Sequence, residues 1–201
     1  MKSRTFGTLA LMAVLTPAAA AWSPLRAPLS IQPESKLWVE GTSTVRAYEC
    51  RATRIDGSVV TEPATAGTAI ADLQKGVKRV EIAIPVSALE CGNATMNDHL
   101  RKALRAAESP VIRYRLASHQ VTARGESTGA VQMSGQLSIA GKENPASIAA
   151  TLERLPGGAL RVKGSEPLKM TDFGVQPPKL MMGTLKVHDP VTVHFDVVLK
   201  P

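Results

Sequence analysis

The sequence predicts a mainly β protein, in which about eight antiparallel strands are accompanied by one principal amphipathic helix. Two observations lead to this fold class. Apolar and polar residues alternate along many short segments, and clusters such as RIDG, GKENP and LPGG separate these segments as turns would. Antiparallel sheets of this size close into a barrel or fold into a sandwich, and the residue pattern alone leaves both open.

Four segments show the clearest alternation, and shorter runs such as KLWVEG and STVRAYECRA complete the predicted sheet. Polar residues stand between the apolar positions, so one face of each strand is expected to be buried and the other to be solvated. The apolar positions are Val80, Ile82, Ile84 and Val86; Ile112, Tyr114 and Leu116; Val131, Met133, Leu137 and Ile139; and Val191, Val193, Phe195 and Val197.

One segment departs from this alternation and predicts a helix over residues 95–107. Thr95 followed by Asp98 resembles a capping box, and Pro110 follows the predicted end. We expect the helix to dock on the sheet through the first three of its apolar positions, Met96, Leu100, Leu104 and Ala107.

The first 21 residues are typical of a secretory signal peptide. A basic start, an apolar run over residues 6–15 and small residues up to Ala21 follow one another in the expected order. The run is too short to span a bilayer, so we expect no stable membrane insertion. Residues 22–36 hold three prolines and read as an extended lead-in, and residues 37–201 form the predicted domain. Export would place the mature protein in the periplasm.

The charge pattern gives little support to a nucleic-acid partner. The formal net charge is +7, but basic residues are interspersed with acidic ones, and few aromatic side chains are available to stack on bases. Whether the protein forms a homodimer is left open by the sequence.

Two cysteines, Cys50 and Cys91, would enter an oxidising compartment after export. A disulfide is the favoured interpretation, and two separately buried thiols are the alternative.

The sequence lacks recognised catalytic or metal-binding motifs. DFG at residues 172–174 has none of the other kinase motifs upstream, and GQLSIAGK has the wrong spacing for a phosphate-binding loop. His188 and His194 share strand parity, but six residues separate them by about 20 Å along a strand. No catalytic residue, metal site or cofactor is predicted, and a binding protein is favoured over an enzyme.

Several long motifs, in order, resemble the YceI-like family of exported, lipocalin-like proteins. They are WVEGTSTVRAYECRA, VEIAIPVSALECGNATMNDHLRKALRAAESPVIRYRL, GQLSIAGKENPASIAA and PLKMTDFGVQPPKLMMGTLKVHDPVTVHFDVVL. The resemblance implies an extended eight-stranded antiparallel barrel whose interior holds an isoprenoid-like or other long-chain amphiphilic lipid. It also implies a non-enzymatic, periplasmic carrier, and the YEC and LEC motifs resemble those of a disulfide-bearing subgroup. A ligand-free, stress-related structural barrel and a lipid-acting hydrolase are the alternatives.

The alternation and the resemblance together define a predicted ligand-binding set. Side chains on three strands should point inward, and residues of the segment 169–187 should close one barrel end. For each of them, ordinary core packing is the alternative to ligand contact. The inward set is Ile82, Ile84, Leu137, Ile139, Val193 and Phe195, and the closing set is Phe173, Leu180 and Met181.

Overall fold

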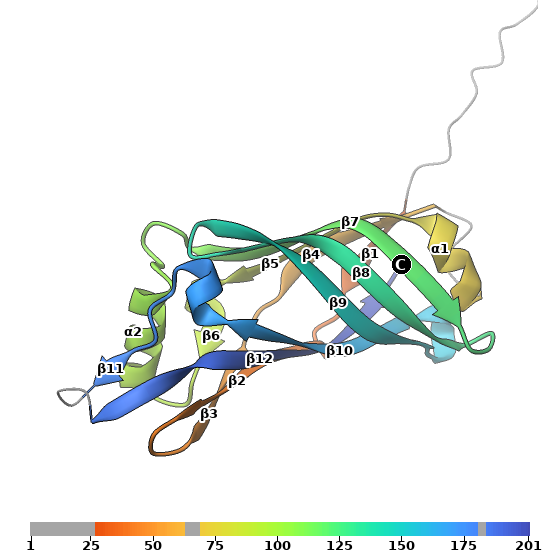
Figure 1. The fold of residues 1–201 in the computed structure, drawn as a ribbon. Helices are drawn as coiled ribbons and strands as arrows, with labels where there is room; N and C mark the ends of the chain where they lie inside the picture. Colours follow the sequence, from red (N-terminus) through yellow and green to blue (C-terminus); the bar gives the residue numbers. More distant parts are fainter. Residues whose placement is uncertain (1–26, 63–68, 181–183) are drawn as a thin grey trace, which may run out of the picture.

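The protein forms a closed antiparallel barrel of eight strands, which confirms the predicted fold class (Figure 1). The computed structural model describes residues 27–62, 69–180 and 184–201. The predicted signal peptide and Met181 lie outside the described residues, as does the side chain of Leu180.

The ring is built mostly from neighbours in sequence. In spatial order its strands are β1 (Ala27–Ile31), β4 (Asp56–Thr61), β5 (Val77–Pro85), β7 (Val111–Ala123), β8 (Thr128–Ile139), β9 (Lys142–Arg154), β10 (Leu160–Lys169) and β12 (Leu185–Lys200). Antiparallel pairing of β1 with the end of β12 closes the ring, with Ser30 opposite Lys200 and Ile31 opposite Leu199. Closure removes the free sheet edges from this part of the molecule.

The same sheet continues beyond the ring from the other half of β12. There β12 pairs with β2 (Lys36–Ser43), which pairs with β3 (Ala47–Ala52), which in turn pairs with the two-residue β6 (Leu89–Glu90). A short strand, β11 (Lys179–Leu180), pairs with the start of β12. These strands and α2 (Ala94–Ala103) lie at one end of the elongated barrel, while α1 (Leu73–Gly76) lies at the other (Figure 1).

Short 3-10 turns connect or cover the strands. They are η2 (Ile70–Asp72), η3 (Val86–Ala88), η4 (Pro156–Gly158) and η5 (Met170–Phe173). The turn η2 leads directly into α1, and together they cover one barrel end.

Part of the expected lead-in is itself a strand of the ring. β1 pairs with β4 through Ala27, Pro28 and Leu29, and with β12 through its last two residues. The sequence predicts an extended lead-in over residues 22–36, because this stretch holds three prolines and shows no alternation. Pro28 is tolerated in a strand this short, although a proline cannot donate a ladder hydrogen bond.

The predicted helix is present, but its cap and its end differ from the prediction. Asn93 is the N-cap, and its side-chain oxygen accepts a hydrogen bond from the backbone N–H of Met96 at 2.8 Å. The prediction of a capping box at Thr95 is therefore wrong, and the helix is capped two residues earlier. The α-helix ends at Ala103, and Arg105, with φ of 52°, turns the chain instead of continuing the helix.

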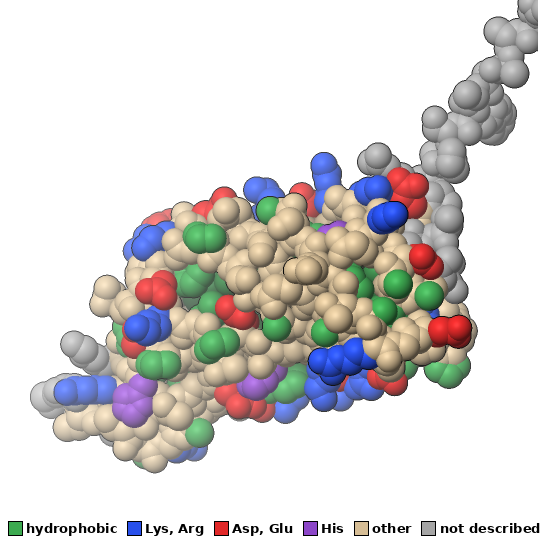
Figure 2. All heavy atoms as spheres, turned by 45° about the vertical axis from the view of Figure 1, so that its right-hand side comes forward, with side chains coloured by type: hydrophobic (Ala, Val, Ile, Leu, Met, Phe, Trp, Pro, Cys, Tyr) green, Lys and Arg blue, Asp and Glu red, His purple; other side chains and the backbone are tan. Residues whose placement is uncertain are grey.

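Buried side chains form two clusters rather than one continuous core. One includes Leu29, Ile70 and Leu73 beside α1, and the other includes Leu104, Tyr114 and Phe173 towards α2. On the outer surface, charged side chains of both signs are scattered among neutral ones on the face that Figure 2 shows.

A candidate ligand-binding cavity

An apolar cavity runs along the inside of the barrel. Its volume is about 470 Å³, within the range of pockets that bury a small molecule. It extends from Leu73 and Leu199 near α1 to Met96 and Leu100 on α2. The lumen is therefore continuous through both halves of the molecule.

The period-two alternation places the lining residues. Alternate residues of β12, from Val191 to Leu199, all border the cavity, and their intervening neighbours face away. A register shift between Leu116 and Ser118 of β7 changes the inward parity, so His119 and Val121 also face the lumen.

The inward side chains keep an exposed surface that a packed core would remove. Val193, Phe195, Ile82 and Ile139 point into the barrel, yet each is only half-buried. In a close-packed interior such side chains would be fully enclosed. The barrel is thus hollow in its middle and packed mainly near its ends.

Three inward-facing glycines help to keep the lumen open. A Cβ added at Gly164 would lie 2.6 Å from Cζ of Phe195, and one at Gly135 would lie 2.9 Å from Oη of Tyr114. A Cβ at Gly41 would likewise overlap the ring of Tyr48 on the neighbouring strand. Each aromatic ring therefore lies against the barrel wall over a glycine instead of projecting across the lumen.

The structure places seven of the nine predicted site residues on the cavity wall. They are Ile82, Ile84, Leu137, Ile139, Phe173, Val193 and Phe195. Ile84, Leu137 and Phe173 also belong to the buried cluster towards α2, so they serve the core as well. Their contact with a ligand stays a prediction. Leu180 and Met181 cannot be placed on this wall, because their side chains lie outside the described part of the chain.

The segment after β10 is fastened over the barrel by polar contacts. The backbone N–H and the hydroxyl of Thr171 donate to the Asp189 carboxylate at 2.8 and 2.7 Å. These hydrogen bonds lower the pKa of Asp189, and the bond from the Thr171 backbone contributes most. Asn144 donates to the carbonyl of Asp172 at 2.9 Å, and Phe173 is buried below. The DFG motif is thus a structural turn.

Two polar groups on the cavity wall were not among the predicted site residues. Glu166 on β10 and Tyr114 on β7 both border the cavity. Burial raises the pKa of Tyr114 to about 12, with a further contribution from the charge of Glu166, and burial raises the pKa of Glu166 as well. Alternation continued from Leu160 through Val162 and Gly164 would have placed Glu166 on the inward face.

Further polar residues gather around the α2 end of the cavity. Ser43, Arg46, His99 and Lys169 border it there. The Ser43 hydroxyl donates to the carbonyl of Arg46 at 2.9 Å, so it is engaged in the turn between β2 and β3. Elsewhere in the cavity, a ring nitrogen of His119 lies 3.1 Å from the carbonyl oxygen of Leu73. These contacts are structural, and none of them joins a hydroxyl to a histidine base.

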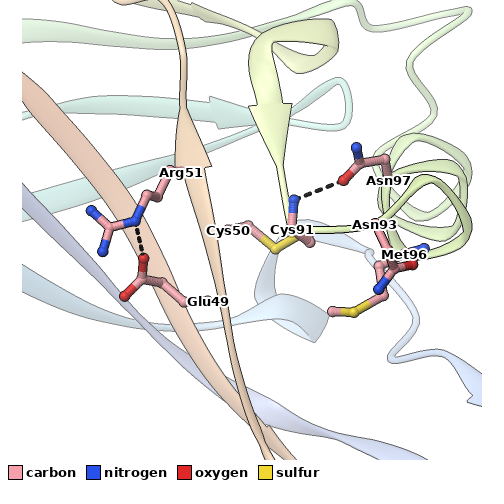
Figure 3. Close-up of a disulfide and its surroundings, with 7 residues drawn as sticks. All are labelled: Glu49, Cys50, Arg51, Cys91, Asn93, Met96 and Asn97. Carbon is pink, nitrogen blue, oxygen red and sulfur yellow. Dashed lines mark hydrogen bonds and ion pairs between the residues drawn. A yellow bond between two sulfur atoms is a disulfide. The ribbon is translucent and has the colours of Figure 1, made fainter.

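The predicted disulfide is confirmed (Figure 3). Cys50 of β3 is bonded to Cys91, which follows β6, with a Cα–Cα distance of 4.0 Å. The backbone N–H of Cys91 donates to Asn97 of α2 at 2.7 Å, while Asn93 caps the same helix. Covalent and hydrogen bonds therefore connect the sheet to the start of α2.

The described ranges contain no cluster of three or more His, Cys, Asp or Glu side chains that could hold a metal ion. Within the same residues, no helix is both long and apolar enough to cross a membrane.

A hollow antiparallel barrel with an apolar lumen is the architecture of proteins that enclose small hydrophobic molecules. The YceI-like domain model matches residues 32–199, and the chain belongs to this family. A search of curated proteins finds no match.

Solved structures with the same fold are distant in sequence. BcnA from Burkholderia cenocepacia is 19% identical with a TM-score of 0.65, covering 84% of this chain and 99% of its own. A polyisoprenoid binding domain from Saccharophagus degradans is 16% identical with a TM-score of 0.63, covering 88% and 99%. The Campylobacter jejuni YceI protein is 16% identical with a TM-score of 0.51, covering 74% and 82%.

Proposed function

We propose that this protein is a periplasmic carrier that holds an isoprenoid-like or similar long-chain lipid inside its barrel. The observation that carries the proposal is the continuous apolar cavity of about 470 Å³. Apolar surface lining such a cavity gains free energy when a hydrocarbon chain replaces water. Met96, Met133 and Met170 also border the cavity, and flexible thioether side chains adapt well to a chain of variable shape.

The relatives support the same class of ligand. The Saccharophagus degradans structure is described as a polyisoprenoid binding domain, and it shares nearly its whole length with this chain. A long prenyl chain carries few polar features, so an extended apolar tunnel is sufficient to recognise most of it.

Export to the periplasm is supported by two features of different kinds. Residues 1–21 have the order of charge, apolar run and small residues that a signal peptide requires. The Cys50–Cys91 disulfide is of the type that persists in oxidising compartments.

Native mass spectrometry of the protein purified from its own periplasm tests the proposal. We expect a stoichiometric hydrophobic adduct that organic extraction removes. A clean apo mass would contradict the carrier function and favour a ligand-free structural barrel. Chemically altered lipid, turned over by the protein, would instead indicate a lipid-acting hydrolase.

A matched pair of substitutions locates the lipid. Val193→Trp places an indole in the lumen, whereas Thr192→Trp places one on the outward face of the same strand. In a hollow barrel, Val193→Trp should abolish lipid retention and leave the fold intact, and Thr192→Trp should do neither. If Val193→Trp instead costs the 1–3 kcal/mol typical of overpacking and no lipid is lost, the lumen does not hold the lipid.

A further inference from the structure

Among the described residues that border the cavity, one is acidic, and its neighbours across the adjacent strands are aliphatic. Glu166 has the inward parity of β10, directly opposite Val193 of β12, which in turn lies opposite Val39 of β2. All three residues border the cavity. A carboxylate among aliphatic side chains is costly unless something hydrogen-bonds to it.

Tyr114 offers the lumen a second polar group. Its side chain is 9% exposed, and its hydroxyl has no hydrogen-bond partner among the described residues. The ring lies over Gly135, which fixes the hydroxyl near the wall of β8. An unsatisfied buried hydroxyl is uncommon in native proteins, and a ligand hydroxyl that enters the adjoining cavity would satisfy it.

The two groups border the same cavity, and the charge of Glu166 contributes to the raised pKa of Tyr114. No side chain in the described ranges forms a hydrogen bond or ion pair with Glu166. The other titratable groups on the cavity wall are Arg46, Tyr48, His99, His119 and Lys169.

We propose that Glu166 and Tyr114 select a lipid whose head group is a neutral hydroxyl, an alcohol or a phenol, and bind that head inside the barrel. The ligand O–H donates to the Glu166 carboxylate, and its oxygen accepts from the Tyr114 hydroxyl. A pure hydrocarbon satisfies neither group. A carboxylate of the same chain length cannot donate and is repelled by Glu166. This inference rests on the proposed lipid-carrier function and adds the chemistry of the head group.

The alternative position for a head group is the α2 end of the cavity. Arg46 and Lys169 border the cavity there and would favour an anion. The two positions therefore predict opposite preferences for lipids that differ only in the head.

Farnesol and farnesoic acid are a suitable pair, because they share one isoprenoid chain. Binding of each to the delipidated full mature protein is measured by displacement of a fluorescent fatty probe at pH 8, where the free acid is ionised. We expect farnesol to bind at least about tenfold more tightly, as the loss of one or two hydrogen bonds to a charged or buried group implies. Equal affinities, or tighter binding of the acid, would overturn the inference and leave the carrier function intact. Binding of neither compound would count against the carrier function itself.

Substitutions assign the preference to the two residues. Glu166→Gln should reduce the ratio of affinities to about threefold or less, because a neutral amide both donates and accepts. Tyr114→Phe should weaken farnesol binding several-fold and leave the acid unchanged. Glu143→Gln, an exposed glutamate on β9, is the matched control and should alter neither affinity. An unchanged ratio in folded Glu166→Gln would show that the carboxylate does not select the head.

Discussion

The two ends of the barrel are closed by different means. Near α1, the ring is completed by the pairing of β1 with β12, and Ile70 and Leu73 are 0% and 3% exposed in the buried cluster there. Near α2, the sheet ends at the two-residue strand β6, and no side chain of α2 is fully buried. Met96 and Leu100 of α2 are half-buried and face the cavity.

This difference shows what a hollow lumen requires of its ends. A plug such as Ile70 gains its free energy from close contact on all sides. A cover over an open cavity lacks that contact on its inner side, so it needs another source of stability. The Cys50–Cys91 disulfide and the Cys91–Asn97 hydrogen bond supply it at the α2 end.

The largest expected effect comes from removing the disulfide. The double substitution Cys50→Ser and Cys91→Ser should lower the free energy of unfolding by about 4 kcal/mol, because the bridge closes a loop with a sequence separation of 41. Urea denaturation of the oxidised protein and the variant measures the loss. Hydrogen exchange should rise first in α2 and β6. Uniformly faster exchange, with the α1 end equally affected, would contradict the division of the barrel into two differently held ends.

The second prediction compares one buried aliphatic side chain at each end. Ile70→Ala should cost about 4 kcal/mol, because Ile70 is completely enclosed. Leu104→Ala should cost about 2 kcal/mol, at the lower limit for buried leucines, since Leu104 also borders the cavity. Urea denaturation of the two variants and the unsubstituted protein measures both losses in the free energy of unfolding.

Lys102→Ala is the control for the Leu104 substitution. Lys102 is exposed on α2, so its loss should change the free energy of unfolding by less than about 0.5 kcal/mol. Equal costs at residues 70 and 104 would mean that the α2 end is packed as tightly as the α1 end.

The strands of the ring could be predicted from sequence because their signal is local. Val191, Val193, Phe195 and Val197 alternate with polar residues, and the barrel keeps that alternation. The disulfide was predictable for a similar reason, since a pair of cysteines in an exported chain has few other uses. The YceI-like resemblance then resolved the choice between a barrel and a sandwich.

Other features depend on contacts that the local pattern does not contain. Pro28 made β1 look like part of an extended lead-in, and its pairing with β4 and with β12, both distant in sequence, makes it a strand. Thr95 fits the local pattern of a capping residue, but the structure starts α2 at Ala94 and caps it with Asn93. Glu166 is a polar residue on the inward face of β10, and its significance appears only when Tyr114 is seen to share the cavity.

Apart from the controls, the smallest expected effect on stability concerns the barrel wall in the α2 half. Gly41→Ala adds a methyl group that would overlap the Tyr48 ring, with Cε1 at 2.8 Å from the new Cβ. No backbone atom is among its three nearest neighbours, so the ring can swing away into the lumen, and the cost should be about 1 kcal/mol. Farnesol affinity should nevertheless fall roughly tenfold, because the displaced ring occupies the space of the lipid chain.

Gly125→Ala is the matched control: its Cβ would meet only Thr128 Oγ1 at 3.7 Å, so both stability and affinity should be unchanged. Unaltered farnesol binding in Gly41→Ala would show that the ring over Gly41 does not set the width of the lumen, and that the α2 half tolerates a bulkier wall than the glycine–aromatic pairs imply.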